Sequence, residues 1–155
     1  MRIGIGYDIH RFVIGKPLVM GGVKIPFDRG LDGHSDADVL LHALCDAIFG
    51  AAAMGDIGQH FPDTDPAYKN ISSVLLLSKT WEMVRHQYPE ILNIDSTIFA
   101  ESPKISPFSE EMKKIIAATV SIDPSQVNIK ATTAEGLGFI GRKEGIAAMC
   151  VIMLA

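Results

Sequence analysis

The sequence predicts an α+β fold in which helices pack mainly on one face of a mixed β-sheet. Segments with the two-residue period of strands and segments with the composition of helices both occur, but they do not alternate strictly along the chain. The length of 155 residues suits one compact domain, and 48% hydrophobic residues are enough to build its core. We therefore expect residues 1–155 to form a single domain without linkers or internal repeats.

The first element is predicted to be a long strand over residues 2–12. Every second residue from Ile3 to Ile9 is apolar, which is typical of a strand with one buried face. Asp8 and His10 are two positions apart, so we expect them to share the opposite face.

A hairpin and a helix are predicted to follow. Within residues 18–25, two short apolar runs are separated by a Gly-Gly pair, which suits a tight turn. Residues 36–53 are rich in Ala and Leu and contain no Pro. We expect Ser35 to be the N-cap of this helix, with Asp36 and Asp38 in its first turn.

The remaining elements are predicted from their composition and from the Pro and Gly residues between them. Residues 54–68 contain several Gly and Pro residues and indicate a long, ordered loop of the kind that often carries function. The other expected elements are helices over residues 71–86 and 106–120, strands over residues 92–100, 127–132 and 146–154, and a loop over residues 135–145.

The charge balance excludes a protein that binds long polyanions through a basic surface. The chain has 14 Lys and Arg against 18 Asp and Glu, a formal net charge of -4, and no basic stripe. Any bound phosphate must therefore be held by local groups, and no nucleic acid is expected.

Cys45 and Cys150 form no C-x-x-C pair and are expected to be buried thiols. The N-terminal residues resemble neither a signal nor a transit peptide, and no apolar run is long enough for a membrane, so we expect a cytoplasmic protein.

Three residues could hold a divalent cation. Asp8 and His10 offer an oxygen and a nitrogen on one face of the first strand, and His42 adds a third ligand if its helix crosses that strand. Three N and O ligands with an open position are typical of catalytic zinc. Asp38 and Asp46 lie four residues before and after His42, and one of them could hydrogen-bond its imidazole. On spacing alone, ordinary exposed or packed residues are the more frequent outcome of so short a motif.

Two other segments could bind phosphate. Gly33, His34 and Ser35 precede a helix, whose N-H groups and dipole attract anions. The predicted strand over residues 127–132 ends in hydroxyl groups followed by Glu135, which could hold Mg²⁺. The alternatives are a plain N-cap at Ser35, a loop role for His34 and a solvated Glu135. The sequence has no dinucleotide-binding fingerprint and no phosphate-loop motif.

Four blocks of sequence, taken together in this order, resemble the 2-C-methyl-D-erythritol 2,4-cyclodiphosphate synthase family. The resemblance covers essentially the whole chain, and the combination of blocks is far more specific than any one of them. The blocks are GYDIHRF at residues 6–12, GHSDADV at residues 33–39 with His42, GDIG through FPDTD at residues 55–65, and KATTAEGLGF at residues 130–139 with Gly141 and Arg142.

The resemblance implies a homotrimer of α+β subunits with active sites at the subunit interfaces. It also implies the reaction: 4-diphosphocytidyl-2-C-methyl-D-erythritol 2-phosphate is converted to 2-C-methyl-D-erythritol 2,4-cyclodiphosphate and CMP, in non-mevalonate isoprenoid biosynthesis. This would be a metal-assisted intramolecular phosphoryl transfer, in which the substrate's own 2-phosphate is the nucleophile.

By the same resemblance, Asp8, His10 and His42 bind Zn²⁺, and Glu135 helps to hold Mg²⁺ or Mn²⁺ at the diphosphate. His34 and Thr133 are the implied catalytic residues. The implied substrate-binding residues are Asp8, Ile9, His10, His34, Ser35, Asp56, Ile57, Gly58, Phe61, Pro62, Asp63, Thr64, Asp65, Ala100, Glu101, Ser102, Pro103, Lys104, Ile105, Ser106, Ala131, Thr132, Thr133, Ala134, Glu135, Phe139 and Arg142.

Several points stay open at the level of sequence. Gly136 stands where some family members carry a lysine, which removes one cation near the phosphates. Phe139 and Arg142 would lie near the threefold axis, where some members hold an isoprenoid diphosphate. Two rival functions share these residues: a zinc-dependent phosphoester hydrolase, and a non-enzymatic scaffold that binds isoprenoid diphosphates. Zn²⁺, Mn²⁺ and Co²⁺ can all accept such ligands.

Overall fold

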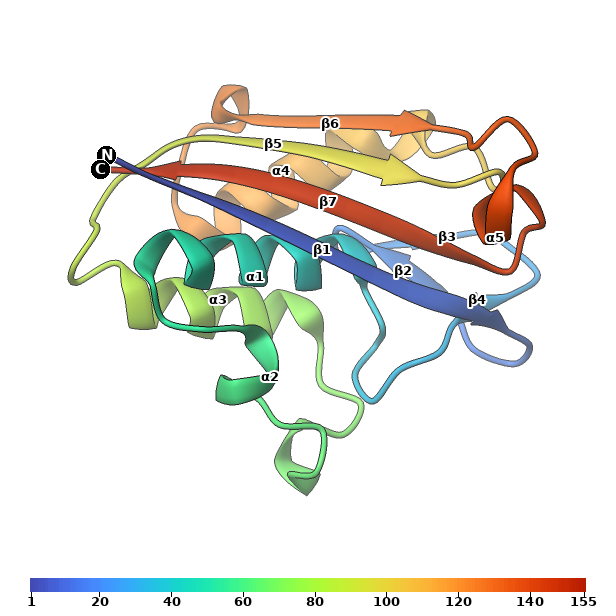
Figure 1. Cartoon of the computed structure of the whole chain (residues 1–155), viewed down its shortest axis with the longest axis horizontal. Coiled ribbons are helices and arrows are strands. Elements are labelled where there is room, and N and C mark those ends of the chain that lie inside the picture. The colour runs from blue at the N-terminus through green and yellow to red at the C-terminus, as the bar shows by residue number, and fades with distance from the viewer.

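A computed structural model describes all 155 residues as an α+β fold built on a five-stranded mixed sheet (Figure 1). The strand order is β4-β1-β7-β5-β6; β5 and β6 run parallel, and the other neighbours run antiparallel. This confirms the predicted fold class. The strands of the sheet are β1 (Arg2–Val13), β4 (Gly30–Leu31), β5 (Ile91–Phe99), β6 (Val127–Thr132) and β7 (Gly145–Leu154), and a separate hairpin contains β2 (Leu18–Met20) and β3 (Val23–Ile25).

The helices pack on one face of this sheet and on one another. The helix α1 contacts both β1 and β7, and α3 packs against α1 and α4. The helices are α1 (Val39–Ala52), α2 (Ile57–His60), α3 (Ser73–Val84), α4 (Ser109–Val120) and α5 (Gly138–Gly141), with three short 3-10 turns at Pro66–Tyr68, Ser106–Phe108 and Pro124–Gln126. The short α5 lies in the segment expected to be a loop. All helices are too short or too polar to span a bilayer.

The face of β1 that packs on the helices is the opposite of the one predicted. Gly4 and Gly6 face α1, where a Cβ atom at Gly4 would lie 1.9 Å from the carbonyl oxygen of Ala47. Only glycine permits so close an approach of strand and helix. The apolar residues Ile3 and Ile5 instead point outward and are 66% and 64% exposed. The two-residue period was therefore predicted correctly, but the buried face was not.

The helix α1 begins later than predicted, and its N-cap is Asp38 rather than Ser35. The Asp38 side chain accepts a hydrogen bond from the backbone N-H of Leu41, three residues into the helix. The same carboxylate accepts the N-H groups of Gly21 and Gly22 at 2.9 and 2.7 Å, so it also fixes the predicted hairpin turn. Asp36 and Asp38 consequently precede the first turn rather than forming part of it.

The core is one cluster of 37 buried residues, and α1 runs through its middle. Both Cys45 and Cys150 are buried free thiols, as predicted. Burial raises the pKa of each thiol to about 12. The chain termini lie side by side at one end of the sheet, where Arg2 pairs with Leu154 (Figure 1).

Candidate active site

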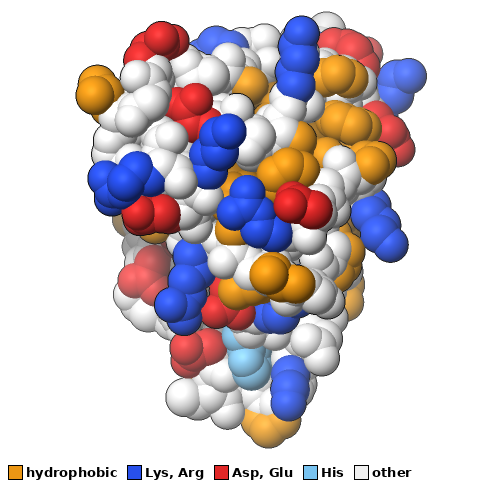
Figure 2. Space-filling model, turned by 90° about the vertical axis from the view of Figure 1, so that its right-hand side faces the viewer, with side chains coloured by type: hydrophobic (Ala, Val, Ile, Leu, Met, Phe, Trp, Pro, Cys, Tyr) orange, Lys and Arg blue, Asp and Glu red, His pale blue; other side chains and the backbone are white.

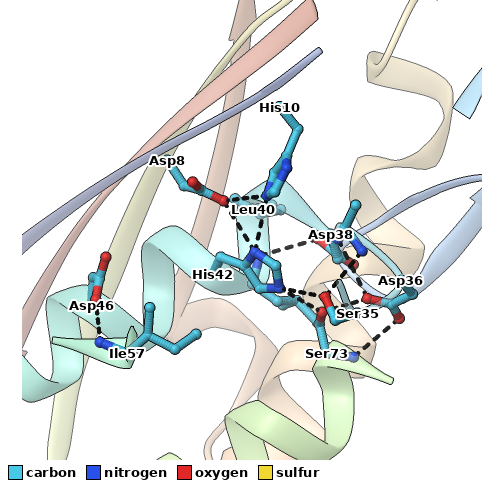
Figure 3. A network of polar contacts seen from close by, with 12 residues as sticks. Asp8, His10, Ser35, Asp36, Asp38, Leu40, His42, Asp46, Ile57 and Ser73 are labelled. Carbon is cyan, nitrogen blue, oxygen red and sulfur yellow. Dashed lines mark hydrogen bonds and ion pairs between the residues drawn. The ribbon is translucent and has the colours of Figure 1, made fainter. Parts of the chain in front are cut away.

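Asp8, His10 and His42 come together at the contact between β1 and α1. Asp8 Oδ2 lies 2.9 Å from His10 Nε2 and 3.1 Å from His42 Nδ1, and the two nitrogens are 3.2 Å apart. All three side chains are partly buried. The close packing at the glycines of β1 brings α1 near enough for His42 to reach the strand (Figure 3).

The geometry and chemistry of these three atoms fit a small divalent cation. In a tetrahedral zinc site with bonds of about 2.0–2.1 Å, neighbouring ligand atoms lie about 3.3 Å apart. The three observed separations, 2.9, 3.1 and 3.2 Å, are close to that value. His10 Nδ1 lies 2.5 Å from the carbonyl oxygen of Asp32, so this nitrogen carries the proton and leaves Nε2 free to bind a metal. The three residues could therefore hold a metal ion and leave a position open for substrate.

The protonation of this cluster reflects how closely its members lie. Burial acts to raise the pKa of the Asp8 carboxyl, but the close imidazoles of His10 and His42 outweigh burial and hold that pKa well below its usual range. Burial likewise acts to lower the pKa of His10, but the neighbouring Asp8 carboxylate raises it overall. The carboxylate is thus ionised and ready to bind a cation at neutral pH.

The predicted partners of the His42 imidazole are wrong. Asp38 is occupied by the hairpin and its own helix, and Asp46 accepts the backbone N-H of Ile57 at 2.7 Å. Neither carboxylate is hydrogen-bonded to the imidazole, although both lie one turn from it along α1. Two serine hydroxyl groups contact His42 Nε2 instead (Figure 3). One belongs to Ser35, which was a predicted site residue for another reason.

The second serine, Ser73, was not predicted to belong to the site. It is the first residue of α3 and is fully buried. Its hydroxyl oxygen lies 3.0 Å from His42 Nε2, and its hydroxyl donates to Asp36. No spacing rule links Ser73 to His42, which lies 31 residues earlier on another helix. Only the packing of α3 against α1 reveals this contact.

A cavity of about 300 Å³ adjoins the metal ligands and contains many of the predicted substrate-binding residues. It lies between the loop that precedes α1, the helix α2 and the start of α3. Its lining residues are His10, Gly33, His34, Ser35, His42, Ile57, Gly58, Phe61, Asp63, Tyr68, Ile71 and Leu76. Asp56 and Asp65 are nearby but cap the local turns, accepting the N-H groups of Gln59 and Ala67 respectively.

A second cavity, of about 340 Å³, lies at the carboxyl ends of the parallel strands β5 and β6. It brings together residues from two segments that were predicted to bind substrate, residues 100–106 and 131–135. Its lining residues are Ala100, Glu101, Pro103, Lys104, Ile105, Ser106, Ala131, Thr132 and Thr133. The Glu101 carboxylate accepts the N-H groups of Ala134 and Gly136 at 2.9 and 3.0 Å and so fixes the loop after β6.

Thr133 and Glu135 lie in this loop and are exposed to solvent. The Thr133 hydroxyl donates to Glu135 Oε1 at 2.9 Å, so the two predicted functional groups are already in contact. The Glu135 carboxylate is accessible and could bind a hard cation such as Mg²⁺.

Within one chain, the predicted site residues are divided between separate places. The cavity beside the metal ligands shares no lining residue with the cavity at Lys104 and Thr133. Phe139 lines a third cavity of about 300 Å³ next to Tyr7, and Arg142 is paired with Glu144 at 2.6 Å. The largest cavity, about 610 Å³ near Arg85, contains none of the predicted residues.

The end of the molecule at the right of Figure 1 carries interspersed basic and acidic side chains, with histidine open to solvent among them (Figure 2). The face drawn there has no continuous basic area. An anionic ligand would have to be held by individual side chains, backbone N-H groups or bound cations rather than by a broad positive field.

Comparison with known proteins supports the family resemblance along the whole chain. The YgbB family model matches residues 1–155. The chain is 59% identical to the 2-C-methyl-D-erythritol 2,4-cyclodiphosphate synthase of Desulfatibacillum aliphaticivorans over 154 residues, which are 99% of each protein. It is 58% identical to the enzyme of the same name from Syntrophobacter fumaroxidans, covering 99% of this chain and 97% of that one.

Solved structures agree with this result. The CDP complex of IspF from Plasmodium falciparum superposes with a TM-score of 0.86 at 36% identity, covering 99% of this chain and 94% of that chain. The bifunctional IspDF of Campylobacter jejuni matches with a TM-score of 0.93 at 47% identity, and this chain spans 41% of its length. The chain belongs to the YgbB family, the family of the 2-C-methyl-D-erythritol 2,4-cyclodiphosphate synthases.

Proposed function

We propose that this protein converts 4-diphosphocytidyl-2-C-methyl-D-erythritol 2-phosphate to 2-C-methyl-D-erythritol 2,4-cyclodiphosphate and CMP, in non-mevalonate isoprenoid biosynthesis. The observation that carries this proposal is the meeting of Asp8, His10 and His42 beside a cavity lined by residues of the family motifs. Relatives with more than half of their residues identical over nearly the full chain bear this enzyme name. We assign the activity to one catalytic domain, residues 1–155, because a single core holds it together.

The active enzyme is proposed to be a homotrimer with its active sites between subunits. Ile3 and Ile5 form an apolar row with Tyr7 on the outer face of β1, and no helix covers them. Such a row on a sheet is expected to pack against another protein surface. A substrate with a nucleotide at one end and a sugar phosphate at the other needs both cavities, which lie apart in one chain. A neighbouring subunit that brings its Lys104 to the metal ligands of the first would complete the site.

The cation held by Asp8, His10 and His42 is proposed to be Zn²⁺, because two imidazoles and one carboxylate suit this ion. Glu135 is proposed to help hold Mg²⁺ or Mn²⁺ at the diphosphate. When bound, these cations would neutralise phosphate charge and polarise the phosphoryl oxygens.

The reaction is proposed to be an in-line displacement within one substrate molecule. An oxygen of the 2-phosphate forms a bond to the β-phosphorus, and the bond from that phosphorus to the CMP oxygen breaks. The protein supplies no nucleophile. Its residues hold the two ends of the substrate in reacting position, which can contribute about 7–11 kcal/mol in well-oriented intramolecular reactions. His34 and Thr133 are proposed to donate hydrogen bonds to oxygens that gain charge in the transition state.

The space around the threefold axis is a proposed site for an isoprenoid diphosphate. Phe139 and Tyr7 line a cavity on the outer face of the sheet, and Arg142 lies nearby with Glu144 as its ion-pair partner. Saturable binding of an isoprenoid diphosphate that is lost in Arg142→Ala would support this site. Binding that is unchanged in this variant would contradict it.

Release of CMP from the cytidine-diphosphate substrate, with and without a chelator, tests the main proposal. We expect chelator-sensitive release of CMP together with coupled phosphorus NMR signals from two phosphates in one ring. A zinc hydrolase would instead incorporate one oxygen from labelled water and yield an uncyclised product. A non-enzymatic scaffold would bind isoprenoid diphosphates and release no CMP. Either result would refute the proposed reaction.

A further inference from the structure

The imidazole of His42 has two ends with different surroundings. Nδ1 faces Asp8 and His10, where a metal would lie. Nε2 points the other way, into a small polar group formed by Ser35, Ser73 and Asp36 (Figure 3). A neutral imidazole carries a proton on only one of its two nitrogens. Which nitrogen carries it decides whether Nδ1 can bind a cation.

The hydrogen bonds behind His42 favour one of these two forms. The Ser73 hydroxyl donates its only proton to Asp36 Oδ1, and a carboxylate can only accept. The Ser73 oxygen is left with lone pairs alone to offer to His42 Nε2, which lies 3.0 Å away. Nε2 must therefore be the donor of that hydrogen bond. This contact favours the form with its proton on Nε2, in which Nδ1 keeps a free lone pair directed at the metal position.

The other serine does not enforce the same choice. Ser35 Oγ lies 3.0 Å from His42 Nε2 and accepts the N-H of Ala37 at 3.1 Å. Its own hydroxyl proton has no fixed acceptor, so Ser35 can either donate to Nε2 or accept from it. With Ser35 alone, both forms of the imidazole would be satisfied. The pair of Ser73 and Asp36 opposes the form with a proton on Nδ1, which the Asp8 carboxylate favours because its Oδ2 lies 3.1 Å from that nitrogen.

We propose that Asp36 and Ser73 are positioning residues that favour the proton on Nε2 of His42 and so prepare Nδ1 to bind the metal. This inference rests on the proposed metal role of Asp8, His10 and His42. Partners of this kind typically strengthen metal binding by 10- to 100-fold in metalloproteins. They do so by holding the ring in one orientation and one protonated form.

The neighbouring residue Ser72 provides a matched control. Ser72 is the N-cap of α3, yet its side chain makes no capping hydrogen bond and is exposed. Asp36 Oδ2 instead accepts the backbone N-H of residue 73 at 3.0 Å. The substitution Ser73→Ala removes the hydroxyl but leaves this backbone contact, so the start of α3 keeps its support. Ser72→Ala removes an adjacent hydroxyl that has no such role.

The test compares zinc affinity, by competition with a chromophoric chelator, and the protonated nitrogen of His42, by ¹⁵N NMR of the metal-free protein at a pH where the ring is neutral. We expect Ser73→Ala to weaken zinc binding by about 10- to 100-fold and to raise the fraction of His42 that carries its proton on Nδ1. The wild-type protein and Ser72→Ala should bind zinc equally and show the same, larger fraction with the proton on Nε2.

The possible failures can be told apart. Wild-type protein that binds no zinc would refute the proposed metal site itself. Equal zinc affinity in Ser73→Ala and Ser72→Ala, with the wild-type site intact, would overturn only this inference. Weaker zinc binding in Ser73→Ala with the proton distributed between the two nitrogens as in the wild type would overturn the stated cause, because a general loss of packing would then explain the effect.

Discussion

Replacing Gly6 by Ala tests whether the close contact of β1 with α1 sets the geometry of the metal site. A Cβ atom at this position would lie 1.9 Å from the carbonyl oxygen of Ala43, whereas real Cβ contacts are essentially never shorter than 3.0 Å. The strand and helix must therefore separate by about 1.1 Å, the difference of those two distances. His42 directly precedes Ala43 on α1, so it would move away from Asp8 and His10.

Both stability and metal binding should fall in Gly6→Ala. Forcing an extra group into a packed core costs about 1–3 kcal/mol, which corresponds to a decrease in Tm of roughly 2–12 °C for a chain of this size. A shift of about 1 Å is half the length of a zinc–nitrogen bond, so at least one ligand would lose proper contact with the ion. We expect zinc affinity to fall by about 100-fold or more, because a catalytic group misplaced by about 1 Å can lose about 100-fold in rate and a metal ligand needs similar precision.

Gly50→Ala is the control, because it makes the same chemical change on the other side of the same contact, in α1. The nearest atom to its added Cβ would be the Ile5 carbonyl oxygen at 3.7 Å, an ordinary contact. This variant should be as stable as the wild type or more stable by up to about 1 kcal/mol, because Ala favours a helix more than Gly does. Zinc titration and thermal unfolding of both variants test whether the contact between β1 and α1 positions His42. Wild-type zinc affinity in Gly6→Ala would refute the argument that this contact positions His42.

Four further predictions follow from the structure. His42→Ala should lose zinc binding and CMP release while keeping the native circular dichroism spectrum; near-normal turnover of the metal-stripped variant would contradict its role. Thr133→Ala should lower kcat much more than it weakens substrate binding, as steady-state kinetics with a binding titration would show, and an unchanged kcat would exclude a transition-state contact. Cys45 and Cys150, with pKa values of about 12, should not react with a thiol reagent at pH 8 until the protein unfolds. Because unfolded thiols ionise near pH 8.5, unfolding should also become easier as the pH rises above that value, and rapid labelling of native protein would refute their burial. Ile5→Asp should shift the sedimenting species from three times the chain mass of 16.8 kDa to that mass itself, and an unchanged trimer would argue against the outer face as the interface.

The sequence predicted the elements well but could not predict which face of β1 is buried. Alternating apolar residues normally indicate the face that packs on the core, and the row that includes Ile3 and Ile5 has this pattern. In the structure, the buried face of β1 is instead the one that carries Gly4 and Gly6, because α1 packs too close to these positions for a larger side chain. An apolar row that packs against another subunit has the same sequence pattern as one that packs inside, so the pattern alone cannot distinguish them.

The grouping of Asp8, His10 and His42 was predictable from short spacings, whereas the residues that contact it were not. Asp8 and His10 share a strand face, and their relation follows from the strand period. The partners of His42 were sought one turn away along its own helix, but the contact comes from Ser73 on α3. Hydrogen bonds between helices depend on how the helices pack, which no local spacing encodes. The cap of α1 was misplaced for a different reason: Asp38 and Ser35 are both residue types that cap helices, and the local sequence does not decide between them.

The pairing of Arg2 with Leu154 places both ends of the polypeptide at one point of the surface. Along β1, the eight steps from Arg2 to His10 span roughly 26 Å at about 3.3 Å per residue. A tag, a surface anchor or a second enzyme attached to either end would therefore leave the molecule from the same place, far from the metal ligands. Tethering the protein through either terminus should leave the cavity beside His10 and His42 equally accessible.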